Sequence, residues 1–361
     1  MYIFLVFSNF IISFLTKNKK IILFYLFLSY VFIIGLRYDV GLDYLNYEKY
    51  FINKRNCEIG YNFLQSIIYC FNGKFYHLTI LISFFMIFPI IWFMKNNLKK
   101  VDELRIGIFL FLISDFTFSS MNLMRQALAT SFCFLSTDFY YKKKYREFFI
   151  LFLIGFSFHK SACIYILLFF LLNKIKINRI FSIIFLILFF ISRKLISFTD
   201  LLLKTLKLVN IIYPQYSFDR INEFAEYTKL NTSILNLGLL SLIILYILIV
   251  FNKEKYLEYY EKFMFITLVF RILSTQNFIF NRISLYFDLY IFLNVLIYYL
   301  KNKNKGIREK IILGMTIFIL LVNFIKAGYF TSESQKNKYK SIFYEKNLDT
   351  SNKNIELKNK L

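Results

Sequence analysis

Long apolar stretches separated by short charged ones run through most of the chain. They lie at about residues 2–15, 21–36, 76–94, 106–119, 122–140, 147–172, 180–192, 234–251, 263–275, 278–300 and 311–328. A straight transmembrane helix needs about 20 apolar residues, and several of these stretches are shorter. The pattern predicts an all-α, polytopic integral membrane protein in which some segments are tilted, broken or extended into their flanks.

Lys and Arg gather in short clusters between the apolar stretches. The clusters are "TKNKK" (16–20), "KNNLKK" (95–100), "KKKYR" (142–146), "NKIKINR" (173–179) and "KNKNKGIREK" (301–310). Basic loops of membrane proteins stay on the cytoplasmic side. All five clusters are therefore expected on the inner face.

The stretch 147–172 lies between two of these clusters, so a single crossing would put the clusters on opposite sides of the membrane. Two short or re-entrant helices with "FHKS" (158–161) at an outer tip keep both clusters inside. One long tilted helix is the alternative. With the hairpin, the chain has about 12 membrane segments and both termini outside.

Two larger external loops follow from this orientation, at about 37–75 and 193–233. The second mixes amphipathic pieces with tyrosines and is expected to lie on the outer interface like a lid. Residues 1–331 form a single membrane domain, and the polar stretch 332–361 is predicted to be a disordered tail. The first 15 residues lack the basic start and the cleavage site of a signal peptide, which predicts an uncleaved first span.

Composition narrows the function classes. Hydrophobic residues make up 58% of the chain, which excludes an ordinary soluble domain. The net charge of +23 comes from the clusters between apolar stretches, so it reports membrane orientation and not nucleic-acid binding. The four cysteines form no C-x-x-C pair, and two histidines with scattered aspartates give no metal-ligand spacing. No metal and no cofactor is predicted.

Polar residues that lie within or beside apolar stretches gather at the expected outer face. Charges there are costly and usually face a cavity or a partner. The candidates are Arg37, Asp39, Asp43, Tyr44, Tyr47, Arg125, Gln126, His159, Lys160 and Arg282. Asp115 and Asp288 lie slightly deeper, and Arg271 lies well inside its stretch. Cations at one depth with aromatic neighbours suit an anionic phosphate group on an oily or sugar-like ligand.

Several of these residues allow a second interpretation. Asp39 and Asp43 share a face only if their segment is helical, and Gly41 between them makes a turn equally compatible. Tyr44 and Tyr47 suit an interfacial aromatic belt as well as a platform for sugars. The side chain of Arg37 is long enough to reach lipid headgroups. His159 titrates near neutral pH and could act as a general base or bind phosphate.

Four short motifs carry a family resemblance. They are R-x-x-x-G-x-D-Y-x-x-Y (37–47), "EIGYNFLQSIIY" (58–69), "MNLMRQALA" (121–129) and "KKKYREFFILFLIGFSFHKSA" (142–162). In this order the chain resembles, over about residues 20–300, the EpsG family of bacterial exopolysaccharide proteins, which is related to Wzy-type O-antigen and capsule polymerases. Leu42 stands where that pattern has a threonine between Gly41 and Asp43, so a hydroxyl role at this position is lost.

The resemblance implies a multi-pass glycosyltransferase of the bacterial cytoplasmic membrane. It would join polyprenyl-diphosphate-linked oligosaccharide units on the outer face, in contact with membrane lipid and with other polysaccharide-assembly proteins. A flippase for the lipid-linked oligosaccharide and a ligase for finished glycan are the alternatives.

The resemblance also suggests roles for the outer residues. Arg125, Arg37 and Arg282 would bind the donor diphosphate, and either His159 or Asp43 would deprotonate or orient the acceptor hydroxyl. Asp39, Tyr44, Tyr47, Gln126 and Lys160 would contact the substrate.

Overall fold

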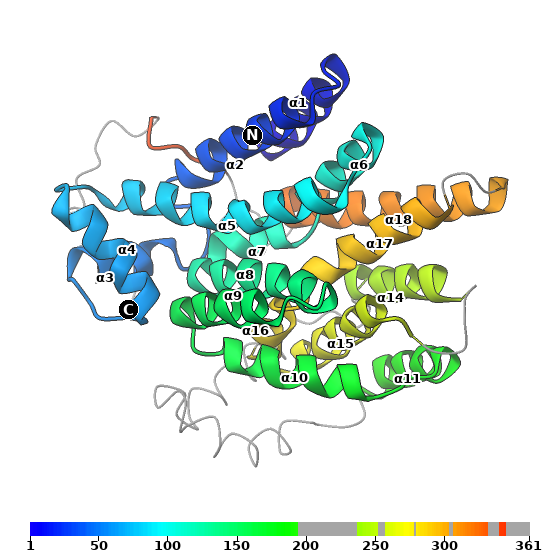
Figure 1. Cartoon of the computed structure of the whole chain (residues 1–361). Helices are drawn as coiled ribbons and strands as arrows, with labels where there is room; N and C mark the ends of the chain where they lie inside the picture. Colours follow the sequence, from blue (N-terminus) through cyan, green and yellow to red (C-terminus); the bar gives the residue numbers. More distant parts are fainter. Residues whose placement is uncertain (194–236, 252–256, 278, 303–305, 331–338, 344–361) are drawn as a thin grey trace, which may run out of the picture.

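The computed structural model describes residues 1–193, 237–251, 257–277, 279–302, 306–330 and 339–343, and it is built from helices (Figure 1). Before the first gap these are α1 (Tyr2–Leu15), α2 (Lys19–Gly35), α3 (Tyr44–Ile52), α4 (Ile59–Cys70), α5 (Phe75–Asn97), α6 (Val101–Leu112), α7 (Phe116–Asn122), α8 (Met124–Tyr141), α9 (Tyr145–Phe158), α10 (Ala162–Lys174) and α11 (Arg179–Ser192). After it come α14 (Leu237–Val250), α15 (Tyr259–Ser274), α16 (Ile279–Leu285), α17 (Leu289–Asn302), α18 (Ile307–Ile325) and the π-helical turn η1 (Lys326–Phe330).

Helices α2 and α5 pack against each other, and contacts at their two ends give their relative direction. At one end the Thr79 hydroxyl, near the start of α5, donates to the Gly35 carbonyl at the end of α2 (2.6 Å). At the other end the Lys19 ammonium donates to the Leu98 carbonyl (3.1 Å). Helices α2 and α5 are therefore antiparallel.

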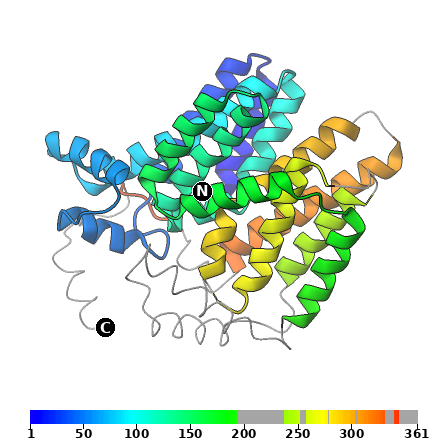
Figure 2. The same ribbon diagram turned by 60° about the horizontal axis from the view of Figure 1, so that its bottom comes forward.

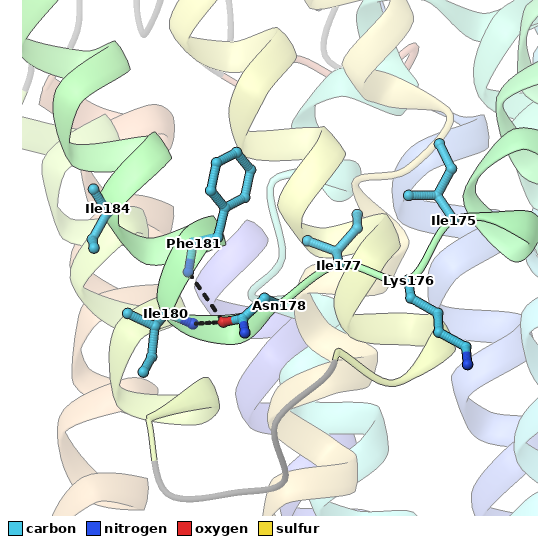
Figure 3. Close-up of a pocket in the computed structure, with 7 residues that line it drawn as sticks. All are labelled: Ile175, Lys176, Ile177, Asn178, Ile180, Phe181 and Ile184. Carbon is cyan, nitrogen blue, oxygen red and sulfur yellow. Dashed lines mark hydrogen bonds between the residues drawn. The ribbon is translucent and has the colours of Figure 1, made fainter.

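The basic clusters meet at the Lys19 end. Three contacts join them: Tyr141 Oη to Asn173 Oδ1 (2.8 Å), Leu257 N to Ile177 O (2.9 Å), and Lys301 Nζ to Glu258 Oε1 (2.7 Å). Two asparagines within the clusters also begin helices, because their side chains accept hydrogen bonds from the first-turn N–H groups. Asn18 caps α2, and Asn178 caps α11 through the amides of Ile180 and Phe181 (Figure 3).

The stretch 147–172 folds as the hairpin of α9 and α10. Phe148 near the start of α9 and Phe169 near the end of α10 have ring centroids 5.3 Å apart, so the chain reverses direction between them. Extended backbone at His159 ends α9. Helices of 14 and 13 residues are only about 20 Å long, which is less than the roughly 30 Å hydrocarbon core of a bilayer. The hairpin matches the prediction, and one long helix does not occur.

Close packing of this hairpin against α8 needs a small residue. A Cβ at Gly155 would lie 3.0 Å from the Ala129 carbonyl oxygen and 3.3 Å from Cys133 Sγ. Glycine lets α9 approach the backbone of α8, and this approach brings the His159 tip beside the first turn of α8.

Two bent helix pairs carry an aspartate at or beside the break. Helices α6 and α7 are bent by 46° across residues 113–115, a break that ends at Asp115. Helices α16 and α17 are bent by 41° across residues 286–288, a break that ends at Asp288. Arg271 of α15 pairs with both: Nη1 lies 2.5 Å from Asp115 Oδ2, and Nη2 lies 3.0 Å from Asp288 Oδ1. One guanidinium thus fastens both bends to α15.

Within the described residues, only Phe75–Asn97 and Ile307–Tyr329 are helices long and apolar enough to cross a membrane unaided, and counting each bent pair as one span raises the number to four. The predicted stretch 106–119 is interrupted at 113–115, and 278–300 is interrupted at 286–288. Each break ends at an aspartate that pairs with Arg271.

The predicted external loop 37–75 contains the helices α3 and α4, which project together at one end of the bundle (Figures 1 and 2). Of the other predicted loop, 193–233, only Arg193 lies among the described residues. In the predicted tail 332–361, the described residues 339–343 pair with residues after α2. Tyr38 N donates to Lys340 O (2.9 Å), and Ile342 N donates to Leu36 O (3.2 Å).

Labelling from outside the cell tests the orientation of the bundle. In a variant without native cysteines, a single cysteine at Lys160 should react with a membrane-impermeant maleimide, whereas cysteines at Lys144 and Lys176 should not, because the last two lie in the basic clusters. Labelling of position 176 as strongly as position 160 would contradict the orientation.

Removing the guanidinium at the two bends should destabilise the fold. Arg271→Ala leaves the buried carboxylate of Asp288 and the partly exposed one of Asp115 without their partner, a loss of about 3 kcal/mol. Thermal unfolding in detergent measures it, with the exposed Arg146→Ala as the matched control. Equal melting temperatures for the two variants would show that the bends do not depend on Arg271.

Candidate functional site

A single carboxylate, that of Glu58, connects two of the predicted site residues. Glu58 Oε2 lies 2.5 Å from Arg125 Nη1, and Glu58 Oε1 lies 3.4 Å from His159 Nδ1. Glu58 precedes α4, Arg125 is in the first turn of α8, and His159 is at the hairpin tip. Three segments that are far apart in the sequence therefore meet at one buried acid.

Two tyrosine rings flank the Arg125 guanidinium. Its carbon atom lies 5.5 Å from the ring centroid of Tyr47 and 5.6 Å from that of Tyr61. Burial raises the pKa of Tyr47, and the positive charges of Arg125 and Arg282 oppose this shift while the Asp43 carboxylate adds to it. Asp43, Arg125 and Arg282 thus all lie within electrostatic range of Tyr47.

The α16 segment touches this site twice. The Gln126 side-chain amide donates to the Arg282 carbonyl, and the hydroxyls of Ser161 and Tyr286 lie 2.8 Å apart. One contact is next to Arg125 and the other is two residues after His159. These contacts link α16 and the break that follows it to the neighbours of Arg125 and His159.

Buried polar atoms at the site lack a hydrogen-bond partner within the described part of the chain. They are Arg125 Nε, Gln126 Oε1 and Tyr61 Oη. Unpaired buried polar atoms are rare in folded proteins. Together they offer a donor, an acceptor and a hydroxyl, a combination that suits a ligand with both phosphate oxygens and hydroxyl groups.

Burial favours the neutral form of the His159 imidazole. It lowers the pKa of the imidazole to about 3, and the positive charges of Arg125 and Arg282 act in the same direction. A neutral imidazole that directs Nδ1–H toward Glu58 keeps a lone pair on Nε2. This is the form that can accept a proton, and the lowered pKa makes it a weaker base than an imidazole in water.

Arg37 lies deeper than the sequence predicted. Its side chain is 1% exposed, and the guanidinium donates to the main-chain carbonyls of Ile34 and Met121. The guanidinium also faces the ring of Tyr44, with 5.8 Å between its carbon atom and the ring centroid. Arg37 therefore joins the end of α2 to the end of α7, and its predicted contact with a diphosphate stays a prediction.

The segment between Arg37 and α3 forms a turn. Gly41 has φ +99°, and a Cβ there would lie 2.7 Å from the Asn122 side-chain oxygen. The same oxygen accepts a hydrogen bond from Leu42 N (2.6 Å). Asp39 pairs with Lys340 (3.3 Å), and Asp43 immediately precedes α3. The turn interpretation holds, so the two aspartates do not share a helical face.

Of the remaining predicted site residues, Lys160 has an exposed side chain, whereas the side chains of Tyr44 and Tyr47 are buried. Lys160 is exposed at the hairpin tip. Tyr44 and Tyr47 are 1% and 6% exposed and pack edge-on against neighbouring rings, Tyr44 against Phe75 and Tyr47 against Tyr50. They form the core between α3, α4 and α5. The predicted sugar platform would need other rings or a rearrangement of these.

An open groove of about 660 Å³ lies at the connection between α10 and α11 and along the first turns of α11 (Figure 3). It is lined by Ile175, Lys176, Ile177, Asn178, Ile180, Phe181 and Ile184. The lining holds one charged group and no acid–base pair. It offers no catalytic arrangement comparable to that around Glu58.

Sequence reasoning missed Glu58 as a site residue. The acid opens the "EIGYNFLQSIIY" motif, and its placement one residue before a helix was visible in the sequence. Within the described ranges, no group of three His, Cys, Asp or Glu side chains could hold a metal ion.

Comparison with known proteins agrees with the motifs. Curated proteins and solved structures gave no significant match. The sequence model of the EpsG family matches residues 20–341, which is most of the chain. The apolar helices and this match identify an exopolysaccharide-related membrane protein. The chain belongs to the EpsG family.

Proposed function

We propose that the chain is a glycosyltransferase that joins polyprenyl-diphosphate-linked oligosaccharide units at the outer face of the bacterial cytoplasmic membrane. The observation that carries the proposal is the Glu58 carboxylate shared by Arg125 and His159, beside buried polar atoms that have no partner. A cation that stabilises the leaving diphosphate and a base that takes the proton of the acceptor hydroxyl are two groups that promote glycosyl transfer from a diphosphate.

Arg125 is assigned the role of stabilising the leaving diphosphate. Its Nη1 is held by Glu58, while its Nε has no partner within the described residues. A guanidinium has five N–H donors in a fixed plane, so Arg125 can keep Glu58 and donate to a phosphate oxygen. As the bond between the anomeric carbon and the phosphate oxygen breaks, this cation stabilises the charge that develops on the diphosphate.

The base is assigned to His159. The acceptor hydroxyl oxygen attacks the anomeric carbon, and its proton passes to Nε2 of the imidazole, whose Nδ1 side faces Glu58. Glu58 then stabilises the imidazolium that forms. Asp43 remains the alternative base, since its carboxylate lies within electrostatic range of Tyr47 at the same site.

The other predicted residues take supporting roles. Arg282 and Lys160 supply positive charge for the second lipid-linked substrate, and Gln126 holds the Arg282 main chain. Arg37 positions the turn 38–43, on which Asp39 and Asp43 lie. About twelve segments enter or cross the membrane, with the basic clusters inside and the Glu58 site outside.

Removing the Arg125 guanidinium, which would stabilise the leaving diphosphate, should strongly slow glycosyl transfer. Arg125→Ala is expected to lower turnover at least about 100-fold, because one electrostatic donor to a developing charge typically contributes that much. The measurement is release of polyprenyl diphosphate and growth of glycan from purified lipid-linked units. Arg146→Ala, which removes an exposed arginine from a basic cluster, is the matched control. Normal polymer from well-expressed Arg125→Ala would overturn the assignment.

Substitutions of His159 and Asp43 should show which of the two residues acts as the base. His159→Gln is expected to lower turnover by about 100-fold or more with little effect on acceptor KM, as for loss of a general base. Asp43→Asn should have a smaller effect. The reverse order of the two effects would move the base to Asp43, and polymer made by both variants at normal rates would exclude each of them.

Burial of a neutral His159 also predicts a pH dependence of stability. The folded-state pKa of about 3 lies below the unfolded value near 6.5, so stability is fully present above pH 6.5 and is lost as pH falls toward 3. Between pH 7 and 5 the wild type should lose about 2 kcal/mol relative to His159→Gln. Thermal unfolding at the two pH values measures the difference. Parallel pH curves for both proteins would contradict it.

A further inference from the structure

Helix α4 carries large apolar side chains on both its inward and its outward side. The inward side holds Tyr61, Leu64, Gln65 and Ile68, which are buried. The large apolar residues exposed on the outward side are Ile59 and Phe63, followed by Phe71 directly after the helix, at 83%, 64% and 82%. Residues 59, 63, 67 and 71 recur at intervals of four, which places them along one side of a helix. We call this side, including the half-buried Ile67, the α4 stripe.

A helix in water turns its apolar side toward the protein and a polar side toward the solvent, whereas α4 has large apolar side chains on its exposed side as well. Large apolar patches on the surface mark contacts with a partner or a membrane. The stripe lies in the segment 37–75, which the sequence alone placed outside the membrane. Its side chains need an apolar environment there.

Exposed positive charges lie close to α4. Lys54 and Arg55 precede it in the sequence and Lys74 follows it. Lys54 Nζ lies 5.7 Å from the ring centroid of Tyr69, which puts Lys54 beside the last turn of α4. Cations flanking an apolar helix face match the phosphate groups of phospholipids, while the apolar side chains between them match the acyl chains. Charge and hydrophobicity thus complement the same partner.

The stripe continues the lipid-facing side of α9. A Cβ on Gly60 at the start of α4 would lie within 3 Å of Ser157 and Phe158, so the two helices touch there. On α9, Leu153 and Phe156 are also exposed, at 59% and 38%. Because α9 belongs to the membrane hairpin, the exposed apolar surface runs from a membrane segment onto α4.

We propose that α4 lies in the outer leaflet of the membrane, with the stripe against phospholipid acyl chains and the flanking cations at the headgroups. This would place Glu58, one residue before Ile59, at headgroup depth. A diphosphate carried by a lipid would lie at that depth, so the site would open sideways to the bilayer.

Fluorescence quenching tests the depth of the stripe without depending on glycan transfer. Single cysteines replace Phe63 or Phe71 in a variant without native cysteines and are labelled with bimane. The protein is reconstituted in phosphatidylethanolamine–phosphatidylglycerol vesicles that contain lipids with a nitroxide on the acyl chain. The control label is at Lys49, an exposed position on α3.

The stripe labels should be quenched several-fold more by the nitroxide lipid than the Lys49 label, and iodide in the water should give the opposite order. Strong iodide quenching at 63 and 71 would overturn the proposal, as would protection from both quenchers, which would mean that protein covers the stripe. If the substituted chains fail to fold, the native thiol of Cys70, exposed beside the stripe, takes the label after Cys57, Cys133 and Cys163 are replaced by alanine.

Discussion

The Arg271 guanidinium holds together two helices that are each interrupted, and the position of the site depends on this bond. A charge removed from water requires a partner, and Arg271 finds one at each bend, Asp115 and Asp288. The α16 segment that precedes Asp288 then contacts Gln126 through the Arg282 carbonyl. The short helix α16 thus lies between the Arg271 ion pairs at the bends and the polar contacts of α8.

The same need for partners organises the site itself. Glu58 is buried and contacts both Arg125 and His159, so removing its carboxylate would take a partner from both groups. The breaks in the helices are what make such polar groups available at this depth. A continuous helix would satisfy its own backbone and would leave fewer polar ends to meet a ligand.

Much of the helix order, the hairpin at 147–172 and the grouping of Arg125 with His159 could be predicted from the sequence, because apolar stretches and basic clusters report local hydrophobicity and orientation. The role of Glu58 could not, since it depends on α4 packing beside the hairpin tip. Burial of Arg37 and of the tyrosines on α3 was missed for the same reason: exposure at a membrane surface is decided by tertiary packing. The bends were hidden because Asp115 and Asp288 gain their partner only in three dimensions.

The pairing of residues 339–343 with the end of α2 sets a time order for assembly. Asp39 and Lys340 are separated by 301 positions, and ribosomes add about 5–20 residues each second. Synthesis of Lys340 therefore follows synthesis of Asp39 by a time on the order of 15–60 s, and until then Asp39 has no ion pair with Lys340. During that interval Arg37 and Asp39 lack residues 339–343, which later lie beside them. This edge of the bundle is completed only after nearly all of the described helices have been made.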